Sequence, residues 1–445
     1  MAEVKDFTKY LKKLQRKKDE DRDENPFDAL NRDYDWEEQI RHPERVQASG
    51  YLDADDRTGT GSKGISYQER IRKHRIAVAI RTVVLIAVTA FVVVAVYISW
   101  RDKHFTESSI TSSVKIADSS GAKAINLGGY VLTYSKDGAS CIDGEGQQLW
   151  NQTYQMQNPT VHTCKNVVAI GDYNGHNIYV ANTSGALGEI DTNLPIRDFC
   201  VASQGVVAAA LDDKNVTWIY LFDASGNTLA NFKTTMQDSG YPVDISISPS
   251  GELVCVSYLK ADSGKLKTSV AFFNFGDVGQ NLADNYASGY DYPDVVVPYV
   301  QFMNDSKIFA VADDRIMFYS GKEVPTSQTE SLTGDEEIRS VFYNDSYVGI
   351  VFVNNTDEGA YRLQIYGETG NLDTTIYFDT EYVDVLFDNG QIVVYGENEY
   401  ILYDMKGTEK YRGTFDRAVK VMVPTNVRSK FLLVGEKSLD TLELK

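Results

Sequence analysis

The stretch DISISPSGELVCVSYL, from Asp244 to Leu259, decides the fold. Ile245 and Ile247 alternate with serines, a Pro-Ser-Gly turn follows, and a second apolar run begins at Leu253. Two alternating runs joined by such a turn indicate a β-hairpin with one buried face. A single hairpin is only marginally stable in water, so this one needs neighbours that cover its apolar face.

The same hairpin recurs from residue 122 to the end of the chain. Eight copies are found, and their second strands begin near residues 130, 167, 206, 252, 307, 347, 391 and 430. A third and a fourth strand joined by a glycine turn follow most copies, as in WIYLFDASGNTLANF from Trp218 to Phe232. Four strands about every 40 residues predict an all-β fold, a β-propeller. We expect eight blades, with seven as the alternative because the interval from 252 to 307 is irregular.

The two ends of the repeat region complement each other. The last copy ends at SLDTLELK, its third strand, and the first copy is preceded by a lone strand, ITSSVKIAD, from Ile110 to Asp118. We predict that this lone strand completes the last blade and closes the ring, since closure removes an exposed sheet edge. Residues 110–445 then form one propeller, and residues 101–109 are a linker.

A segment before the propeller is long and apolar enough to cross a membrane. It runs from Ile76 to Trp100 and has no charge between Thr82 and Ser99. As a helix it would reach about 37 Å, which exceeds the thickness of a bilayer core. Trp100 would lie in the aromatic belt at one end. We therefore predict a transmembrane signal anchor over residues 76–100.

Flanking cations predict the orientation of this anchor. Five of them precede or enter the segment: Arg70, Arg72, Lys73, Arg75 and Arg81. Only Arg101 and Lys103 follow it closely, with Asp102 between them. The positive-inside rule then places residues 1–75 in the cytoplasm and the propeller outside the plasma membrane, as a single-pass protein.

The cytoplasmic tail, residues 1–75, is predicted to be mostly disordered because it is highly charged. Near its start, residues 4–18 place Phe7, Leu11 and Leu14 on one face of a short basic amphipathic helix. Such a helix would lie on an anionic leaflet, dock on a cytoplasmic partner, or fray without a role. An acidic run with spaced aromatic residues follows, which we interpret as a docking motif or a linker.

Charge is unevenly distributed along the chain. Residues 1–75 balance 17 Lys and Arg against 17 Asp and Glu, and residues 76–104 carry a charge of +2. Because the whole chain carries −19, residues 105–445 carry −21. A body this acidic repels nucleic acid, so we predict no nucleic-acid partner.

Four cysteines lie within the predicted propeller, without metal-binding spacing: Cys141, Cys164, Cys200 and Cys255. We expect buried free thiols, since free cysteine is among the most buried residue types. One bridge, between Cys164 and Cys200, is the alternative.

No residue pattern in the propeller indicates catalysis. Its only histidines, His162 and His176, form no HExxH or HxH pair, and no G-x-S-x-G elbow occurs. We predict no catalytic residue, no metal and no cofactor. The alternative is a cell-surface hydrolase acting on glycans or peptides, which acids of raised pKa lining the central channel would favour.

One long loop stands out as a candidate binding surface. The stretch GDVGQNLADNYASGYDYPD, from Gly276 to Asp294, carries Tyr286, Tyr290 and Tyr292 among acids. Tyrosine supplies a large amphipathic contact area at low entropic cost. We predict that this loop binds a protein or glycan partner; the alternative is a fourth strand with an ordinary connection.

Two repeat motifs carry a family resemblance. The Gly-x-x-Leu-Trp of GEGQQLW, from Gly144 to Trp150, and the turn SPSGELV, from Ser248 to Val254, resemble repeats of quinoprotein-like and YVTN-like bacterial propellers. With the charged tail and the single anchor, the chain is similar to an uncharacterised family of membrane-anchored proteins of Gram-positive bacteria. That resemblance, over residues 70–445, implies a host type and a fold but no activity. The predicted function is a membrane-anchored scaffold that binds a protein or ligand at the cell surface, with coupling to the cytoplasm through the tail.

Overall fold

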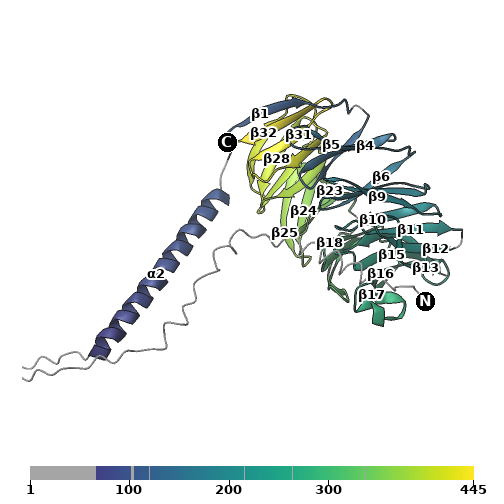
Figure 1. Cartoon of the computed structure of the whole chain (residues 1–445), viewed down its shortest axis with the longest axis horizontal. Coiled ribbons are helices and arrows are strands. Elements are labelled where there is room, and N and C mark those ends of the chain that lie inside the picture. The colour runs from purple at the N-terminus through teal and green to yellow at the C-terminus, as the bar shows by residue number, and fades with distance from the viewer. Residues whose placement is uncertain (1–66, 102–104, 120, 215, 263, 335) are drawn as a thin grey trace, which may run out of the picture. The chain divides into compact units, whose positions relative to one another are not determined.

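The computed structural model describes residues 67–101, 105–119, 121–214, 216–262, 264–334 and 336–445 (Figure 1). The described residues belong to two units, a single helix and a β-propeller. The tail with its predicted helix over residues 4–18 lies outside the described residues.

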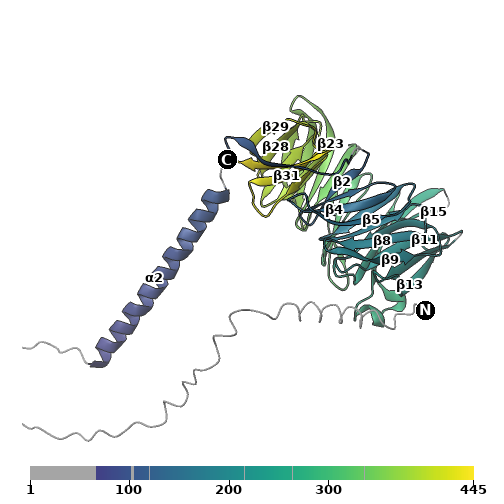
Figure 2. The ribbon, with the colours of Figure 1, turned by 45° about the horizontal axis from the view of Figure 1, so that its top comes forward.

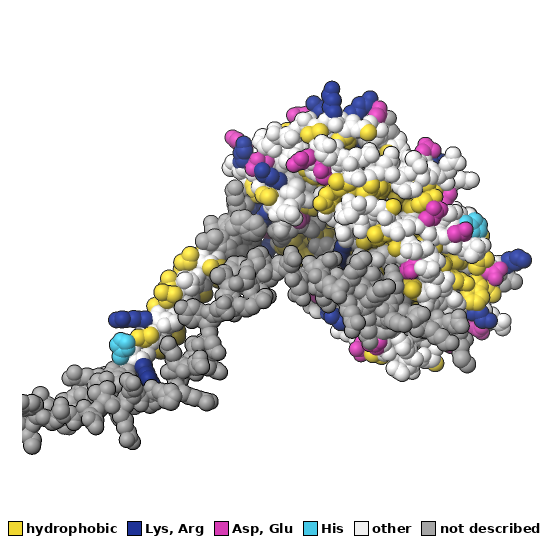
Figure 3. Space-filling model, viewed as in Figure 1, with side chains coloured by type: hydrophobic (Ala, Val, Ile, Leu, Met, Phe, Trp, Pro, Cys, Tyr) yellow, Lys and Arg dark blue, Asp and Glu magenta, His cyan; other side chains and the backbone are white. Residues whose placement is uncertain are grey.

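The helix, α2, runs from Tyr67 to Arg101. Its segment His74–Ala95 includes an 18-residue window with a mean hydropathy of 2.6, so α2 is long and apolar enough to cross a membrane by length and composition. Hydrophobic side chains are visible along it (Figure 3). The hydroxyls of Thr82 and Thr89 donate hydrogen bonds of 3.0 Å to backbone carbonyls four residues earlier. Both hydroxyls are thus satisfied within the helix itself.

The predicted orientation residues lie on or beside α2. Arg75 and Arg81 are exposed on it. The side chains of Arg70, Arg72, Lys73 and Trp100 are outside the described part, although their backbone is helical.

The propeller has eight antiparallel four-stranded blades, which confirms the eight-blade prediction over the seven-blade alternative (Figures 1 and 2). First strands of neighbouring blades contact one another, which places these strands around the ring axis. Blade 1 consists of β2 (Lys123–Leu127), β3 (Tyr130–Tyr134), β4 (Gly138–Ile142) and β5 (Gln148–Thr153), and blade 2 consists of β6 (Pro159–Cys164), β7 (Val167–Asp172), β8 (Asn177–Asn182) and β9 (Gly185–Asp191). Blade 3 consists of β10 (Ile196–Val201), β11 (Val207–Asp213), β12 (Val216–Phe222) and β13 (Thr228–Thr235), and blade 4 consists of β14 (Tyr241–Ile247), β15 (Leu253–Asp262), β16 (Lys265–Asn274) and β17 (Tyr286–Pro293).

The second half of the ring repeats this arrangement. Blade 5 consists of β18 (Tyr299–Asn304), β19 (Lys307–Val311), β20 (Arg315–Ser320) and β21 (Thr326–Leu332). Blade 6 consists of β22 (Ile338–Tyr343), β23 (Tyr347–Thr356), β24 (Gly359–Gly367) and β25 (Leu372–Phe378). Blade 7 consists of β26 (Asp384–Asp388), β27 (Gln391–Tyr395), β28 (Glu399–Asp404) and β29 (Glu409–Thr414). Blade 8 consists of β30 (Val421–Pro424), β31 (Lys430–Val434), β32 (Ser438–Leu444) and β1 (Ser108–Lys115).

Strand β1 closes the ring, as the unmatched ends of the repeat region predicted. It pairs antiparallel with β32, from Ser108 opposite Leu444 to Lys115 opposite Ser438. In Figure 1 the dark blue β1 lies among the yellow strands of blade 8. We call the face of the ring where β1 begins the entry face and the face where it ends, at Lys115, the far face.

The core lies between blades, which explains how the first hairpin is covered. Ile245 and Ile247 of β14 are each 4% exposed and share one cluster with Ala208 of blade 3 and Phe273 of blade 4. Gly251 in the connecting turn has φ of 77°, a backbone conformation that glycine adopts without strain. Packing one blade on the next therefore buries the apolar face that an isolated hairpin would expose.

Candidate partner-binding site

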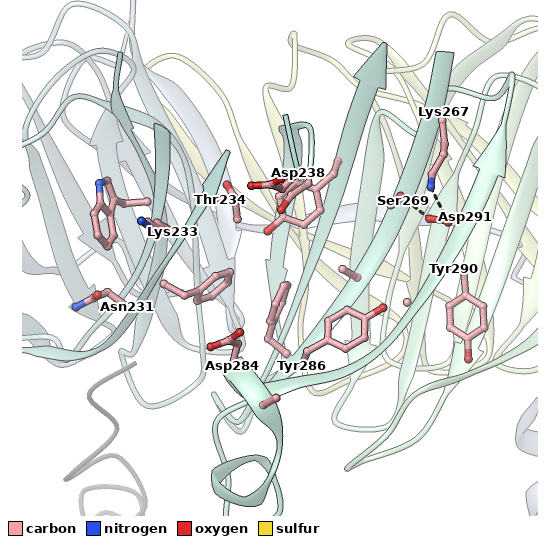
Figure 4. A pocket seen from close by; sticks show the side chains of 18 residues that line it. Asn231, Lys233, Thr234, Asp238, Lys267, Ser269, Asp284, Tyr286, Tyr290 and Asp291 are labelled. Carbon is pink, nitrogen blue, oxygen red and sulfur yellow. Dashed lines mark hydrogen bonds and ion pairs between the residues drawn. The ribbon is translucent and has the colours of Figure 1, made fainter. Parts of the chain in front are cut away.

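A groove of about 780 Å³ lies between blades 3 and 4 (Figure 4). We call it the blade 3–4 groove. Blade 3 lines it with four consecutive residues, 231–234, of its outermost strand β13. Consecutive side chains of a strand point to opposite faces, so an unbroken run of lining residues means that the edge of β13 borders the groove. That edge is not paired with another strand of the described residues.

Blade 4 lines the groove in a different pattern. Its strand β16 contributes every second residue: Lys267, Ser269, Ala271 and Phe273. Alternation of this kind means that a face of the blade borders the groove, and the consecutive residues 289–291 of β17 add to the lining beside that face. The open edge of β13 in blade 3 therefore lies opposite a face of blade 4.

Aromatic side chains give the groove an apolar surface. The ring centroids of Phe232 and Phe273 are 4.4 Å apart, and those of Phe273 and Tyr286 are 5.9 Å apart in an edge-to-face arrangement. Trp218 also lines the groove, from β12. Aromatic rings of this number provide contact area that binds apolar side chains of a ligand.

Charged side chains line other parts of the groove. Lys267 Nζ lies 2.6 Å from Asp291 Oδ2, and Ser269 Oγ donates to Asp291 Oδ1 over 2.5 Å. The bonds from Lys267 and Ser269 lower the pKa of Asp291 below its ordinary value. Figure 4 shows this group toward one end of the groove and Asp284 with Tyr286 toward the other.

The backbone before β17 positions Tyr286. Asp284 and Asn285 adopt left-handed φ values of 53° and 59°, which non-glycine residues rarely take. The buried Asn285 side chain donates Nδ2 hydrogen bonds to the carbonyls of Asn274, at 3.0 Å, and Gly279, at 3.1 Å. These bonds hold the turn between the short 3-10 helices η3 (Gly279–Asn281) and η4 (Ala283–Asn285) and the start of β17.

The structure separates the three tyrosines of the predicted loop. Tyr286 is 48% exposed and lines the groove. Tyr290 also lines it, but its hydroxyl donates to Pro325 O and accepts from Ser327 N, both at 3.1 Å. Tyr292 is buried, and its hydroxyl lies 2.7 Å from that of Tyr319 in the core between blades 4 and 5. The three tyrosines of the segment belong to the fourth strand β17, and the role of the segment in partner binding stays a prediction.

Among the acids on the inner strands whose pKa values are raised, Asp198 and Asp244 form a neighbouring pair of the kind that the hydrolase alternative would use. Burial raises the pKa of Asp198 to about 6, and burial together with the neighbouring Asp198 carboxyl raises that of Asp244. Both carboxyls, however, accept hydrogen bonds from the next blade. Asp198 Oδ2 accepts from Ile245 N at 3.2 Å, and Asp244 Oδ2 accepts from Val300 N at 2.6 Å. These hydrogen bonds indicate that the two carboxyls have a structural role, in which they join blades 3, 4 and 5.

The four cysteines and His162 also pack within the propeller. All four cysteines are free, so the prediction of free thiols is confirmed and the alternative bridge from Cys164 to Cys200 is not formed. The ring of His162 packs edge-on against Phe199, with centroids 4.8 Å apart, and burial lowers the pKa of His162 to about 4. Among the residues that the structure describes, no group of three or more His, Cys, Asp and Glu could hold a metal ion.

Comparisons with known proteins give a family. No curated protein matches the sequence. Among solved structures, BamB from Moraxella catarrhalis matches with a TM-score of 0.44 at 10% identity, covering 76% of this chain and 100% of that one. Sqt1 from Chaetomium thermophilum matches with a TM-score of 0.48 at 11% identity, covering 76% and 100%. AztD from Citrobacter koseri matches with a TM-score of 0.42 at 10% identity, covering 67% and 87%.

The sequence comparison covers nearly the whole propeller. Residues 101–444 match a family described as Family of unknown function (DUF5711). The match begins at the end of α2 and includes every strand of the ring. The chain therefore belongs to this family of unknown function.

Proposed function

We propose that the chain is a membrane-anchored scaffold whose propeller binds an extended segment of a protein partner in the blade 3–4 groove. The observation that carries this proposal is the meeting of an open strand edge, β13, with an aromatic blade face. A peptide added beside β13 would pair its backbone with that strand and place alternate side chains against Phe273 and Tyr286.

The chemistry of the groove favours a peptide over a glycan. Alternate residues of the 231–234 run in β13 present backbone N–H and C=O groups at the open edge, and their spacing matches that of another strand. A glycan has no such repeat of donors and acceptors. The Lys267–Asp291 pair and the nearby Lys233 and Asp238 would bind a segment that carries charges of both signs beside apolar residues.

Helix α2 supports membrane anchoring. Its apolar segment is 22 residues long, enough to span a hydrocarbon core of about 30 Å. The cations before the segment outnumber those after it, which supports a cytoplasmic N-terminus. In the sequence, residues 102–107 separate α2 from β1. We propose a plasma-membrane location with the propeller outside.

Protease protection tests this topology. Cells that express the full chain with one epitope before residue 1 and another after residue 445 are treated with protease, before and after opening the cells. The proposal predicts that only the C-terminal epitope is accessible on intact cells. Access to the N-terminal epitope on intact cells, with protection of the C-terminal one, would overturn the orientation.

Site-specific photocrosslinking tests the groove. A photoreactive phenylalanine replaces Tyr286 in the groove or Tyr377 on β25 of blade 6, which is 37% exposed and serves as the matched control. In membranes of the native host, the proposal predicts a discrete adduct to one protein from position 286 and none from position 377. Equal adducts from both positions, or none from position 286, would contradict the groove as the binding site.

A further inference from the structure

A second cavity, of about 1140 Å³, opens where the ring closes. We call it the seam cavity. Its walls are the end of β1 and the residues that lead into β2, residues 417–420 before β30, and residues 435–438 around the turn from β31 to β32. These segments all lie at the far face, opposite the entry face. The seam cavity is therefore separate from the blade 3–4 groove and does not depend on its proposed role.

The seam cavity is cationic within an acidic domain. Its lining includes five cations: Lys115, Lys123, Arg417, Lys420 and Lys437. It includes two carboxylates, Glu397 and Glu436. The surplus of positive charge contrasts with the charge of −21 over residues 105–445, so anions that the rest of the propeller repels are attracted here.

Two of the five cations already serve the structure. Lys420 Nζ donates to Ser119 O at 2.5 Å and to Ala122 O at 3.3 Å. Lys437 Nζ lies 3.0 Å from Asp118 Oδ2. The backbone N–H of Ser119 also donates to Glu436 O at 2.9 Å, which ties the residues before β2 to blade 8. The wall that carries the other cations is therefore held in place before any ligand binds.

Three cations remain for a ligand. Among the described residues, Lys115, Lys123 and Arg417 have no ion-pair partner. They come from β1, from β2 and from the segment before β30, and all three line the same cavity. Arginine and lysine bind phosphate and carboxylate oxygens through charge-assisted hydrogen bonds. Five cations against two carboxylates give the lining a net charge of +3, which a single monovalent anion would not balance.

We propose that the seam cavity binds a small molecule that carries two or more oxyanion groups, phosphate or carboxylate. Lys115 and Lys123 contact it from the N-terminal side of the seam, and Arg417 from the C-terminal side. Because the ligand then bridges the two ends of the ring, its binding stabilises ring closure.

Thermal unfolding of the full chain in detergent tests this site. The probes are pyrophosphate and citrate, each titrated at an ionic strength kept constant with sodium chloride. We expect at least one probe to raise Tm by roughly 2 °C at ten times its Kd, and further with the logarithm of its concentration. The probe that acts identifies phosphate or carboxylate as the preferred group. A Tm that does not rise with the concentration of either probe would overturn the proposal.

Charge-reversal variants locate the effect. Lys123→Glu and Arg417→Glu should each weaken binding of the active probe at least tenfold, measured by calorimetric titration at constant salt. Lys406→Glu is the matched control, since Lys406 is exposed in the turn between β28 and β29 and does not line the cavity. An equal loss in Lys406→Glu, or no loss in the other two variants, would show an unspecific salt effect and contradict the site.

Discussion

The joint between blades 3 and 4 and the seam of blade 8 are built by different means. At the first joint, side chains connect the inner strands: Asp198 of β10 accepts a hydrogen bond from Ile245 of β14. At the seam, backbone pairing of β1 with β32 closes the ring, and Lys420 fixes the residues that lead into β2. The first joint opens outward as an aromatic groove and the second opens at the far face as a cationic cavity.

This difference shows how a repeated fold obtains distinct surfaces. Each blade has the same four-stranded arrangement, so the core between any two neighbouring blades is built in the same way. In our proposals, ligands bind where the outer strand of one blade separates from the next blade, as β13 does from blade 4, or where the chain ends meet. The joints, rather than the blades, would then carry the functional differences.

The largest expected effect comes from removing β1. Deleting residues 108–115 leaves blade 8 with three strands and exposes the edge of β32 to other chains. We expect the protein to lose its monodisperse form and its cooperative unfolding transition, measured by size-exclusion chromatography and calorimetry. The control is a deletion of residues 1–66, which leaves β1 in place. A deletion variant with an unchanged transition would show that the seam does not depend on backbone pairing.

Lys420→Met should have the next largest effect. The substitution keeps a long side chain but removes the donors to Ser119 O and Ala122 O. Leaving such acceptors unpaired costs about 1–3 kcal/mol of unfolding free energy. Denaturant unfolding measures this loss, and Lys406→Met is the exposed control. An equal change in both variants would contradict the structural role of Lys420.

Asp244→Asn should change the pH dependence of the first joint. The pKa values of Asp198 and Asp244 are raised in the folded state, so their contribution to stability is greatest below their ordinary pKa values. Stability then falls as the pH rises through about 6, the folded pKa of Asp198. An asparagine amide can donate to Asp198 and accept from Val300 N without ionising. We expect the variant to be more stable above this pH, by on the order of 2 kcal/mol, with a flatter dependence.

Tm measured from pH 5 to pH 8 tests this expectation, with Asp291→Asn as the control. The pKa of Asp291 is lowered, so its contribution has the opposite sign and is lost only as the pH falls through that lowered pKa. A parallel pH profile for Asp244→Asn and the unmodified chain would refute the assignment of the carboxyl pair.

Tyr286→Ala should have the smallest effect on folding. Its side chain is 48% exposed, so we expect a loss below about 1 kcal/mol of unfolding free energy. Partner capture in native membranes should nevertheless fall at least tenfold, because Tyr286 borders the proposed peptide path. Tyr377→Ala is the control for capture. Unchanged capture by Tyr286→Ala would separate the groove from partner binding.

The ring itself could be predicted from the sequence because alternation and turns recur at a regular interval. The start of each second strand and the unmatched strand before residue 122 are local patterns, and they determined the blade count and the closure. The missing fourth strand of the last copy predicted that a strand before residue 122 pairs with β32, but it did not predict the register, which shifts between Ile110 and Ser112.

The groove could not be predicted because its residues are distant in sequence. The three tyrosines of the predicted loop also could not be distinguished from one another by sequence pattern. Phe232 and Phe273 meet only after blade 3 packs on blade 4. Tyr286, Tyr290 and Tyr292 would share one face of a regular strand, but a register shift between Phe272 and Phe273 offsets the start of β17. That shift separates the exposed Tyr286 from the buried Tyr292.

Hydrogen exchange of the propeller with its captured partner tests the central claim most directly. The partner crosslinked through position 286 is purified with the full chain, and backbone exchange is compared with that of the free protein. The account predicts exchange slowed at least tenfold in β13, whose edge would pair with the partner, and unchanged exchange in β25 on blade 6. Unchanged exchange in β13, or protection confined to other blades, would contradict partner binding along the groove.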